Sequence, residues 1–425
     1  MNAEVIAIGD EILSGHTRDT NFAVIAARLG DVGIQIAQHT VVPDEREALG
    51  RELTQALERA SIVILTGGLG ATPDDLTRRV MASALGRKLI FREGLLGQLR
   101  EKYASRGVTM SPAHEAMALV PAGAQPLENR LGMAPGLLLR TERSVLFALP
   151  GVPAEMECML TELVIPLLQR EGITSHASRE VLRTVGVSEM TLAQTIRPLI
   201  GKGVQVAYLP GPRRVDLRLW TPPGEANNRV LGETVEAVAS RLGPIVYGRG
   251  DSTLEETVVE LARRRRRTIG LGESLTGGRI GAALTQVAGS SQVFHGGVVS
   301  YSNRAKVDLL GVAPATLDAY GAVSASTAEE MASGARRRLH ADIGLSATGI
   351  AGPSGGSPQK PVGLVHFGLS DAQQTRSLAT RLGGSREMIL EACVTLALNM
   401  LRLLLIDRTE LLWDDPAASG ESRGR

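Results

Sequence analysis

Two polar segments in the C-terminal half of the chain contain residue types that could carry out acyl transfer. Ser274 lies in "GLGESLTGGRIGA" (270–282), directly after an apolar stretch that predicts a buried strand. Tyr301 and Lys306 lie in "SYSNRAK" (300–306), at the end of a second predicted strand. A serine hydroxyl needs a base to become nucleophilic, and a lysine can be that base where its pKa falls from ~10.4 towards ~7–8. The alternative interpretation is a helix-capping serine and a solvated lysine.

Histidine is the usual base for a nucleophilic serine, but this region offers few histidines. His295 and His366 both lie within apolar strand patterns, which favours a packed or strand-surface role for each of them. Lys306 therefore stays the candidate base, because a Ser-Lys pair is an established substitute for Ser-His.

A third polar segment, "SATGIAGPSGG" (346–356), also ends a predicted strand. Its Thr348, Gly349 and Gly352 could cradle a phosphate or supply backbone N–H groups to an oxyanion. Because α/β folds bind ligands at the carboxyl ends of their strands, we expect this loop to join Ser274 in one site.

A glycine-rich segment near the N-terminus, "TGGLGATPDD", indicates different chemistry. It places Gly67, Gly68 and Gly70 in the turn after a predicted buried strand, where backbone N–H groups can approach a phosphate. Asp74 and Asp75 follow in the first turn of a predicted helix, and such carboxylates suit a divalent cation on a diphosphate, or a ribose hydroxyl. The alternative is that both aspartates only cap the helix and match its dipole.

Two more segments add oxygen ligands to the same predicted sheet edge. "GDEILSGHTRDTN" supplies Asp10, Glu11, Asp19 and Asn21, and "LPGVPAEM" supplies Glu155. Together these segments predict a cleft with several carboxylates. The two "LTGG" stretches of the chain have flanks that share no period, so they are separate turns and not an internal repeat.

Short apolar strands alternate with helices over most of the chain, which indicates α/β domains with mostly parallel sheets. We predict two three-layer α/β domains joined by a small α+β module. The expected boundaries are 1–169, 170–249 and 250–410, followed by a disordered tail at 411–425. Within the module, "PGPRR" between two strands predicts a hairpin turn.

Composition excludes several function classes. The net charge of +1 over 425 residues gives no indication of nucleic acid or an anionic membrane, and 3% aromatic residues leave few rings to stack on bases. The arginine run at 263–267 is interpreted as the solvated end of a helix. Cys158 and Cys393 show no disulfide or zinc spacing, which fits a reducing compartment. We expect no membrane-spanning run and no signal peptide, and therefore a cytoplasmic location.

The order of "GDEILSGHTRDTN", "TGGLGATPDD", "LPGVPAEM", "ESLTGG", "YSNRAK" and "TGIAGPSGG" resembles the competence/damage-inducible CinA family. The resemblance covers residues 3–407. It implies an N-terminal domain similar to the molybdopterin-binding fold, with metal-dependent ADP-ribose pyrophosphatase activity. It also implies a KH-type middle domain and a C-terminal domain that deamidates nicotinamide mononucleotide and releases ammonia.

The resemblance also implies roles for single residues. Ser274 is the implied nucleophile, with Lys306 and Tyr301 assisting proton transfer. The residues implied to contact the nucleotide in the C-terminal domain are Thr276, Gly277, Gly278, Asn303, Thr348, Gly349 and Gly352. In the N-terminal domain we expect Gly67, Gly68, Gly70, Thr72 and Asp75 to contact the substrate. The acidic residues there outnumber the positions that one ion needs, and the candidate metal ligands are Asp10, Asp74 and, as a further candidate near the cleft, Asp44.

The expected cofactor of the N-terminal domain is a divalent metal ion (Mg, Mn or Co), with potassium as a further candidate, and the deamidase domain needs none. The expected partners are nicotinamide mononucleotide, ADP-ribose and a second copy of the chain, as a homodimer. Nucleic acid is not expected, because residues 171–249 contain no G-x-x-G loop. The alternative function is an N-terminal domain that binds a pterin or dinucleotide without turning it over.

Overall fold

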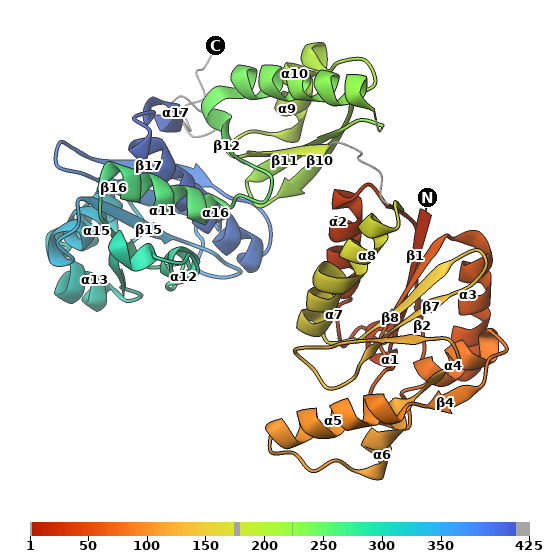
Figure 1. Ribbon diagram of the computed structural model, residues 1–425. Coiled ribbons are helices and arrows are strands. Elements are labelled where there is room, and N and C mark those ends of the chain that lie inside the picture. The colour runs from red at the N-terminus through yellow and green to blue at the C-terminus, as the bar shows by residue number, and fades with distance from the viewer. Residues whose placement is uncertain (1, 174–178, 223, 414–425) are drawn as a thin grey trace. The chain divides into compact units, whose positions relative to one another are not determined.

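The computed structural model describes residues 2–173, 179–222 and 224–413, and the chain forms two compact units, 1–178 and 179–425 (Figure 1). The first unit has a six-stranded sheet in the order β2-β1-β3-β8-β7-β6. Its strands are β1 (Asn2–Ile8), β2 (Gln35–Val42), β3 (Ile62–Thr66), β6 (Gln125–Leu127), β7 (Gly136–Arg140) and β8 (Val145–Leu149). Strands β2, β1, β3 and β8 run parallel, and β7 and β6 continue the sheet antiparallel.

Helices cover both faces of this sheet because its central strands are apolar on both sides. In β1, Ile6 and Ile8 pack with α3 (Arg46–Arg59) and α4 (Thr77–Ala84). Val5 packs on the other face, with α2 (Asn21–Asp31), α7 (Pro153–Met159), the π-helical turn η2 (Leu160–Val164) and α8 (Ile165–Arg170), as Figure 1 shows. The predicted three-layer α/β arrangement is confirmed for this unit.

The remaining elements lie beyond the carboxyl ends of the strands or in one long excursion of the chain. They are α1 (Asp10–Leu13), β4 (Leu89–Phe91), α5 (Glu93–Ser105), α6 (Pro112–Glu115), the 3-10 turn η1 (Ala116–Ala118) and β5 (Leu119–Pro121). Strands β4 and β5 pair with each other as a separate two-stranded sheet. Helix α5 buries Leu96, Leu99 and Tyr103 in the same core as α3 and α4.

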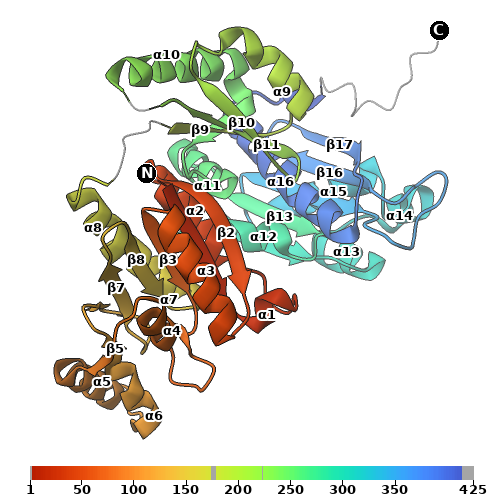
Figure 2. The same cartoon turned by 90° about the vertical axis from the view of Figure 1, so that its right-hand side faces the viewer.

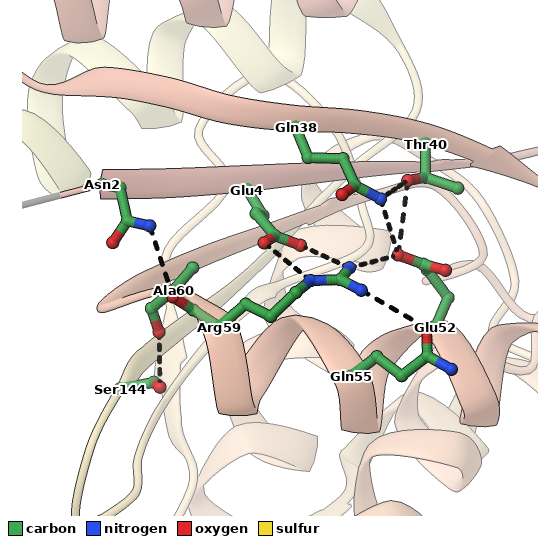
Figure 3. A network of polar contacts seen from close by, with 9 residues as sticks. All are labelled: Asn2, Glu4, Gln38, Thr40, Glu52, Gln55, Arg59, Ala60 and Ser144. Carbon is green, nitrogen blue, oxygen red and sulfur yellow. Dashed lines mark hydrogen bonds and ion pairs between the residues drawn. The ribbon is translucent and has the colours of Figure 1, made fainter.

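A charged network lies near the amino end of β1 (Figure 3). Glu4, which is 3% exposed, accepts hydrogen bonds from Arg59 Nε at 3.0 Å and Nη2 at 2.8 Å. Arg59 Nη2 also donates to Glu52 at 2.9 Å, and Glu52 in turn contacts Gln38 and Thr40 of β2. Arg59, whose side chain is 40% exposed, thus pairs the buried Glu4 of β1 and also Glu52, so the network ties α3 to the sheet.

The second unit begins with a four-stranded antiparallel sheet in the order β10-β11-β9-β12. Its elements are β9 (Arg179–Thr184), α9 (Glu189–Ile196), η3 (Arg197–Leu199), β10 (Gln205–Gly211), β11 (Arg214–Trp220), α10 (Glu225–Leu242), η4 (Gly243–Ile245) and β12 (Val246–Arg249). Helices α9 and α10 pack their apolar residues against the sheet. The predicted α+β character of this module and the predicted hairpin turn, at 212–213, are confirmed.

The rest of the second unit is a second three-layer domain, with a sheet in the order β14-β13-β15-β16-β17. Its elements are α11 (Leu254–Arg265), β13 (Ile269–Glu273), α12 (Arg279–Thr285), η5 (Ser290–Gln292), β14 (Phe294–Val299), α13 (Asn303–Leu310), α14 (Pro314–Tyr320), α15 (Ala325–Arg338), β15 (Ile343–Gly349), β16 (Leu364–Ser370), β17 (Thr375–Arg381) and α16 (Arg386–Leu405). Helices α11, α12 and α16 pack on one face, and α15, with α13 and α14 beside it, packs on the other (Figure 2).

The structure of this domain adds elements that the sequence analysis did not predict, and it corrects the start of the tail. Between β14 and β15 the chain makes three helices, because Gly311 (φ 71°) ends α13, Pro314 starts α14 and Ser324 caps α15. Strand β17 was not predicted. Residues 411–413, the predicted start of the tail, lie in α17 (Glu410–Trp413), and 414–425 are outside the described residues.

The expectation that no apolar run is long enough to span a membrane also needs correction. Among the described residues one helix, α16, has the length and the apolar composition of a membrane span. However, 67% of its apolar stretch is buried inside the protein, where it packs with α11 and the sheet. Helix α16 therefore serves as the core helix of its domain.

Candidate functional site

The structure brings Ser274 and Lys306 into direct contact. Ser274 follows the last residue of β13, and Lys306 lies in α13, which begins after Ser302 caps it by accepting the N–H of Ala305 at 3.1 Å. Lys306 Nζ lies 2.9 Å from Ser274 Oγ and donates to the carbonyl oxygen of Ser300 at 2.8 Å. The lysine is 1% exposed, so it is not a solvated helix lysine. The serine is 8% exposed and does not cap α12, whose N-cap residue is Gly278.

Burial decides which protonation state this lysine can adopt. Because the ammonium form loses its hydration, burial lowers the pKa of Lys306 from 10.5 to about 8. A neutral amine can donate one N–H to the Ser300 carbonyl and accept the Ser274 proton on its lone pair. The pair therefore has the geometry and the proton affinity of a nucleophile with its general base.

The glycine turn after Ser274 is not an open cradle for a phosphate. The N–H of Gly277 donates to Ser274 O at 3.1 Å, and the N–H of Gly278 donates to the Glu273 carboxylate at 3.0 Å. Among the described residues, no acceptor contacts the backbone N–H of Leu275 or Thr276. These two N–H groups, and not those of the glycines, are the ones left to bind a developing negative charge.

The carboxyl end of β15, which carries Thr348 and Gly349, lies beside Ser274. Ser274 N donates to Ala347 O at 3.0 Å, which places Thr348 next to the serine. The Thr348 hydroxyl donates to Ala322 O at 2.7 Å, and a Cβ on Gly349 would lie 2.6 Å from Leu364 O. Thr276 is 1% exposed, and its hydroxyl has no hydrogen-bond partner among the described residues.

Tyr301 and Asn303 lie at the exposed side of the site. Tyr301 is 63% exposed, and its hydroxyl accepts a 3.3 Å hydrogen bond from Arg386, which also donates to Gly352 O at 2.8 Å. No contact of the Tyr301 hydroxyl with Ser274 is present in the described part of the chain. Sequence reasoning missed Arg386, whose position at the start of α16 carries no motif signal.

Within the described part of the chain, no hydrogen bond joins His295 or His366 to Ser274. His295 lies exposed on β14, where Nδ1 lies 3.0 Å from Leu339 O. His366 pairs with Thr348 across β15 and β16, and burial lowers its pKa below the ordinary value. The predicted strand positions of both histidines are confirmed.

The first unit carries a cavity of about 660 Å³ at the carboxyl ends of β1, β3 and β8. Gly67, Gly68, Gly70 and Thr72 line it. Gly67 has φ 109°, and a Cβ there would lie 2.6 Å from Ile8 O, so only glycine lets β1 and β3 end side by side. The predicted glycine turn is therefore part of a cavity.

Asp75 orders this turn. The prediction that Asp75 lies in the first turn of a helix is wrong, because helix α4 begins after it. Asp75 accepts the N–H groups of Gly70 and Thr72 at 2.7 Å each and also the Thr72 hydroxyl. Helix α4 starts only at Thr77, because the chain first makes a tight turn in which Asp75 N donates to Thr72 O. Arg78, which sequence reasoning missed, is 7% exposed and donates to Gly70 O at 2.8 Å.

Carboxylates gather at this cavity without forming a complete metal site. Asp44 and Asp74 line it, whereas Asp10 instead donates its backbone N–H to Asp44 at 3.0 Å. Burial, together with the negative charges of Asp10, Glu11 and Asp74, raises the pKa of Asp44. These oxygen donors suit a hard divalent cation. However, no three acidic, histidine or cysteine side chains lie close enough to hold one among the described residues, so this ligand set stays a prediction.

Sequence comparisons find matches along most of the chain. A family model described as a probable molybdopterin binding domain matches residues 4–170, the damage-inducible protein CinA KH domain matches 179–248, and the CinA C-terminal domain matches 251–405. A CinA-like protein of Acaryochloris marina is 39% identical over 412 residues, which are 95% of this chain and 98% of the relative. A protein of Halothermothrix orenii described as competence-damage inducible is 41% identical over 374 residues, 87% of this chain and 90% of the relative.

Among solved structures, the competence/damage inducible protein CihA from Agrobacterium tumefaciens is 44% identical to this chain. The match covers 35% of this chain and 95% of that structure, with a TM-score of 0.33. The identity with whole-length relatives and the order of the three matched domains agree with the motifs seen in the sequence. The chain belongs to the CinA family.

Proposed function

We propose that the C-terminal domain hydrolyses the carboxamide of nicotinamide mononucleotide to a carboxylate and ammonia. The observation that carries this proposal is the 2.9 Å contact between the buried Lys306 amine and the Ser274 hydroxyl. Such a pair performs acyl transfer on an amide. The choice of nicotinamide mononucleotide as the substrate rests on the resemblance to the family.

In the acylation step, Ser274 Oγ forms a bond to the carboxamide carbon while its proton moves to neutral Lys306 Nζ. The backbone N–H groups of Leu275 and Thr276 donate to the oxyanion, since the glycine N–H groups are already used. The carbon–nitrogen bond then breaks, and the Lys306 ammonium returns its proton to the leaving nitrogen, which departs as ammonia.

Water completes the reaction on the resulting ester. Lys306 takes a proton from the water as its oxygen bonds to the acyl carbon, and the bond from that carbon to Ser274 Oγ breaks. The lysine then returns a proton to the serine. The sum is one amide and one water converted to one carboxylic acid and one ammonia, which leaves the enzyme unchanged.

Conversion of nicotinamide mononucleotide by the purified full-length chain tests this proposal. Ammonia and nicotinate mononucleotide should form in equal amounts, and a chelator should not change the rate, because every step uses groups of the chain. Absence of ammonia over a range of pH from 7 to 10 would refute the assignment of substrate.

We propose as a second activity that the N-terminal domain hydrolyses ADP-ribose to AMP and ribose 5-phosphate. The supporting observation is the cavity of about 660 Å³ that combines the glycine turn with Asp44, Asp74 and Asp75. Backbone N–H groups of such a turn bind phosphate oxygens, and a divalent ion (Mg, Mn or Co), when bound, would neutralise the diphosphate. Potassium is a further candidate ion.

Release of AMP from ADP-ribose, assayed with each divalent ion and with and without potassium, tests the second activity. Binding of ADP-ribose without AMP release under any of these conditions would instead support the binding-only alternative. We further propose that the protein works in the cytoplasm and that it forms a homodimer. The molar mass of the purified chain, measured by light scattering, checks the homodimer.

A further inference from the structure

We propose that Glu273, which comes directly before the serine, is a positioning residue that sets the geometry of the Ser274–Lys306 pair. This inference rests on the proposed role of Ser274 and deepens it. Glu273 is 1% exposed, and its carboxylate accepts three backbone N–H groups: Gly278 at 3.0 Å, Ile280 at 3.1 Å and Gly281 at 2.9 Å. Hydrogen bonds to an ionised acceptor are the strong ones, so three of them hold the segment after Ser274 firmly.

The same residue also holds the lysine, through its main chain. The Glu273 carbonyl oxygen accepts the N–H of Ser300 at 2.7 Å, and the Ser300 carbonyl accepts Lys306 Nζ at 2.8 Å. Glu273 thus connects to the turn that carries the nucleophile by its side chain and to the base by its backbone. Glu273 therefore holds both Ser274 and Lys306, whose Oγ and Nζ atoms make the 2.9 Å contact.

The position of Glu273 excludes a direct part in proton transfer. Its carboxylate bonds to α12, which packs with α11 and α16 on one face of the sheet. Lys306 lies in α13, which packs with α15 on the opposite face. Because successive residues of a strand point to opposite faces, Glu273 and Ser274 face different layers. Glu273 therefore acts through the turn and not on the substrate.

The test compares Glu273→Gln with wild type and with Glu256→Gln, a control in the same domain. Glu256 caps α11 by accepting the N–H of Thr253 at 2.9 Å, so its loss weakens a helix terminus away from the serine. Glutamine at 273 keeps one acceptor oxygen but turns an NH₂ group towards a backbone N–H. The measured quantity is the rate at which a fluorophosphonate phosphonylates Ser274 Oγ in the full chain, with loss of fluoride, read by mass spectrometry.

The expected result is labelling about 100-fold slower in Glu273→Gln, the size of effect that a misplaced reacting group causes. Glu256→Gln should label at the wild-type rate. The pH midpoint of labelling should stay at about 8 in Glu273→Gln, because burial of Lys306 sets it, while the plateau falls. Equal rates in folded Glu273→Gln and wild type, or no labelling of Ser274 in wild type, would overturn the proposal.

Hydrogen exchange keeps the proposal testable if Glu273→Gln does not fold. In the wild-type chain the N–H groups of Gly278, Ile280 and Gly281 should exchange as slowly as that of Ala282, which bonds within the helix. Fast exchange, as for free first-turn amides, would overturn it. A wild type that labels at Ser274 but does not deamidate nicotinamide mononucleotide would refute the proposed substrate and leave the role of Glu273 standing.

Discussion

Lys306 Nζ lies 2.9 Å from Ser274 Oγ, although the two residues are 32 positions apart and come from different elements. The serine follows β13, and the lysine sits one turn into α13, after the neighbouring strand β14. The two parallel strands end at the same edge, so their following segments meet. The contact is buried, which makes the amine a base at mildly alkaline pH.

The first prediction concerns pH. Because the amine acts as a base only when neutral, kcat/KM for nicotinamide mononucleotide should rise with pH, reach half its maximum near pH 8 and level off above it. Initial rates of ammonia release from pH 6 to 10 measure this profile. A profile that falls with rising pH over this range would contradict a neutral lysine.

The second prediction concerns the stability cost of the buried lysine. Its pKa is about 8 when folded and 10.5 as the ordinary value, so the unfolded chain binds more protons between these pH values. The wild-type free energy of unfolding should therefore rise from pH 8 to 10.5. Below pH 8 the destabilisation that comes from burying the charged Lys306 should be fully present.

Lys306→Met removes that penalty while it keeps the volume of the side chain. We expect the variant to be more stable than wild type by about 1–3 kcal/mol at pH 7, with the difference shrinking towards pH 10, and to lose ammonia release. Urea unfolding at both pH values measures the difference. A variant less stable than wild type at pH 7 would show that the hydrogen bonds of the lysine outweigh its desolvation.

The third prediction concerns Tyr301. Its hydroxyl is exposed and contacts Arg386, whereas the lysine reaches the serine directly. Tyr301→Phe should therefore lower kcat by less than about tenfold, an effect below that of a general base. A loss of more than about 100-fold would instead support a tyrosine in the proton-transfer path.

The fourth prediction separates two neighbouring aspartates of the first unit. Asp75→Ala should lower the free energy of unfolding by about 1–2 kcal/mol, because the N–H groups of Gly70 and Thr72 lose their acceptor. The matched variant Asp74→Ala, at an exposed cavity residue, should leave stability unchanged and slow AMP release. Thermal unfolding and the ADP-ribose assay read the two effects. Equal destabilisation by both variants would contradict the distinct role of Asp75.

Much of the fold follows from local patterns in the sequence. The apolar stretch before Ser274 and the glycines after it predict a strand, a turn and a helix, and the structure has β13, the turn and α12 in that order. The meeting of strand ends at one sheet edge then places Lys306 and Thr348 near the serine. Periodicity and turn residues are sufficient for this level of detail.

Details that depend on side-chain contacts between distant residues could not be predicted in this way. Asp75 resembles a helix-capping residue in the sequence, yet its carboxylate bonds to a turn that begins five residues earlier. Glu273 has the pattern of a strand residue, and only the folded chain shows its three N–H partners. The direction of Tyr301, towards Arg386, likewise depends on a helix 85 positions away.

The most direct test of the central claim is ammonia release from nicotinamide mononucleotide by Ser274→Ala. The account predicts that the variant folds like wild type by circular dichroism and loses at least about 10⁴-fold in kcat, as expected when a catalytic nucleophile is removed. Ammonia release within about tenfold of wild type by the folded variant would contradict serine catalysis in this domain.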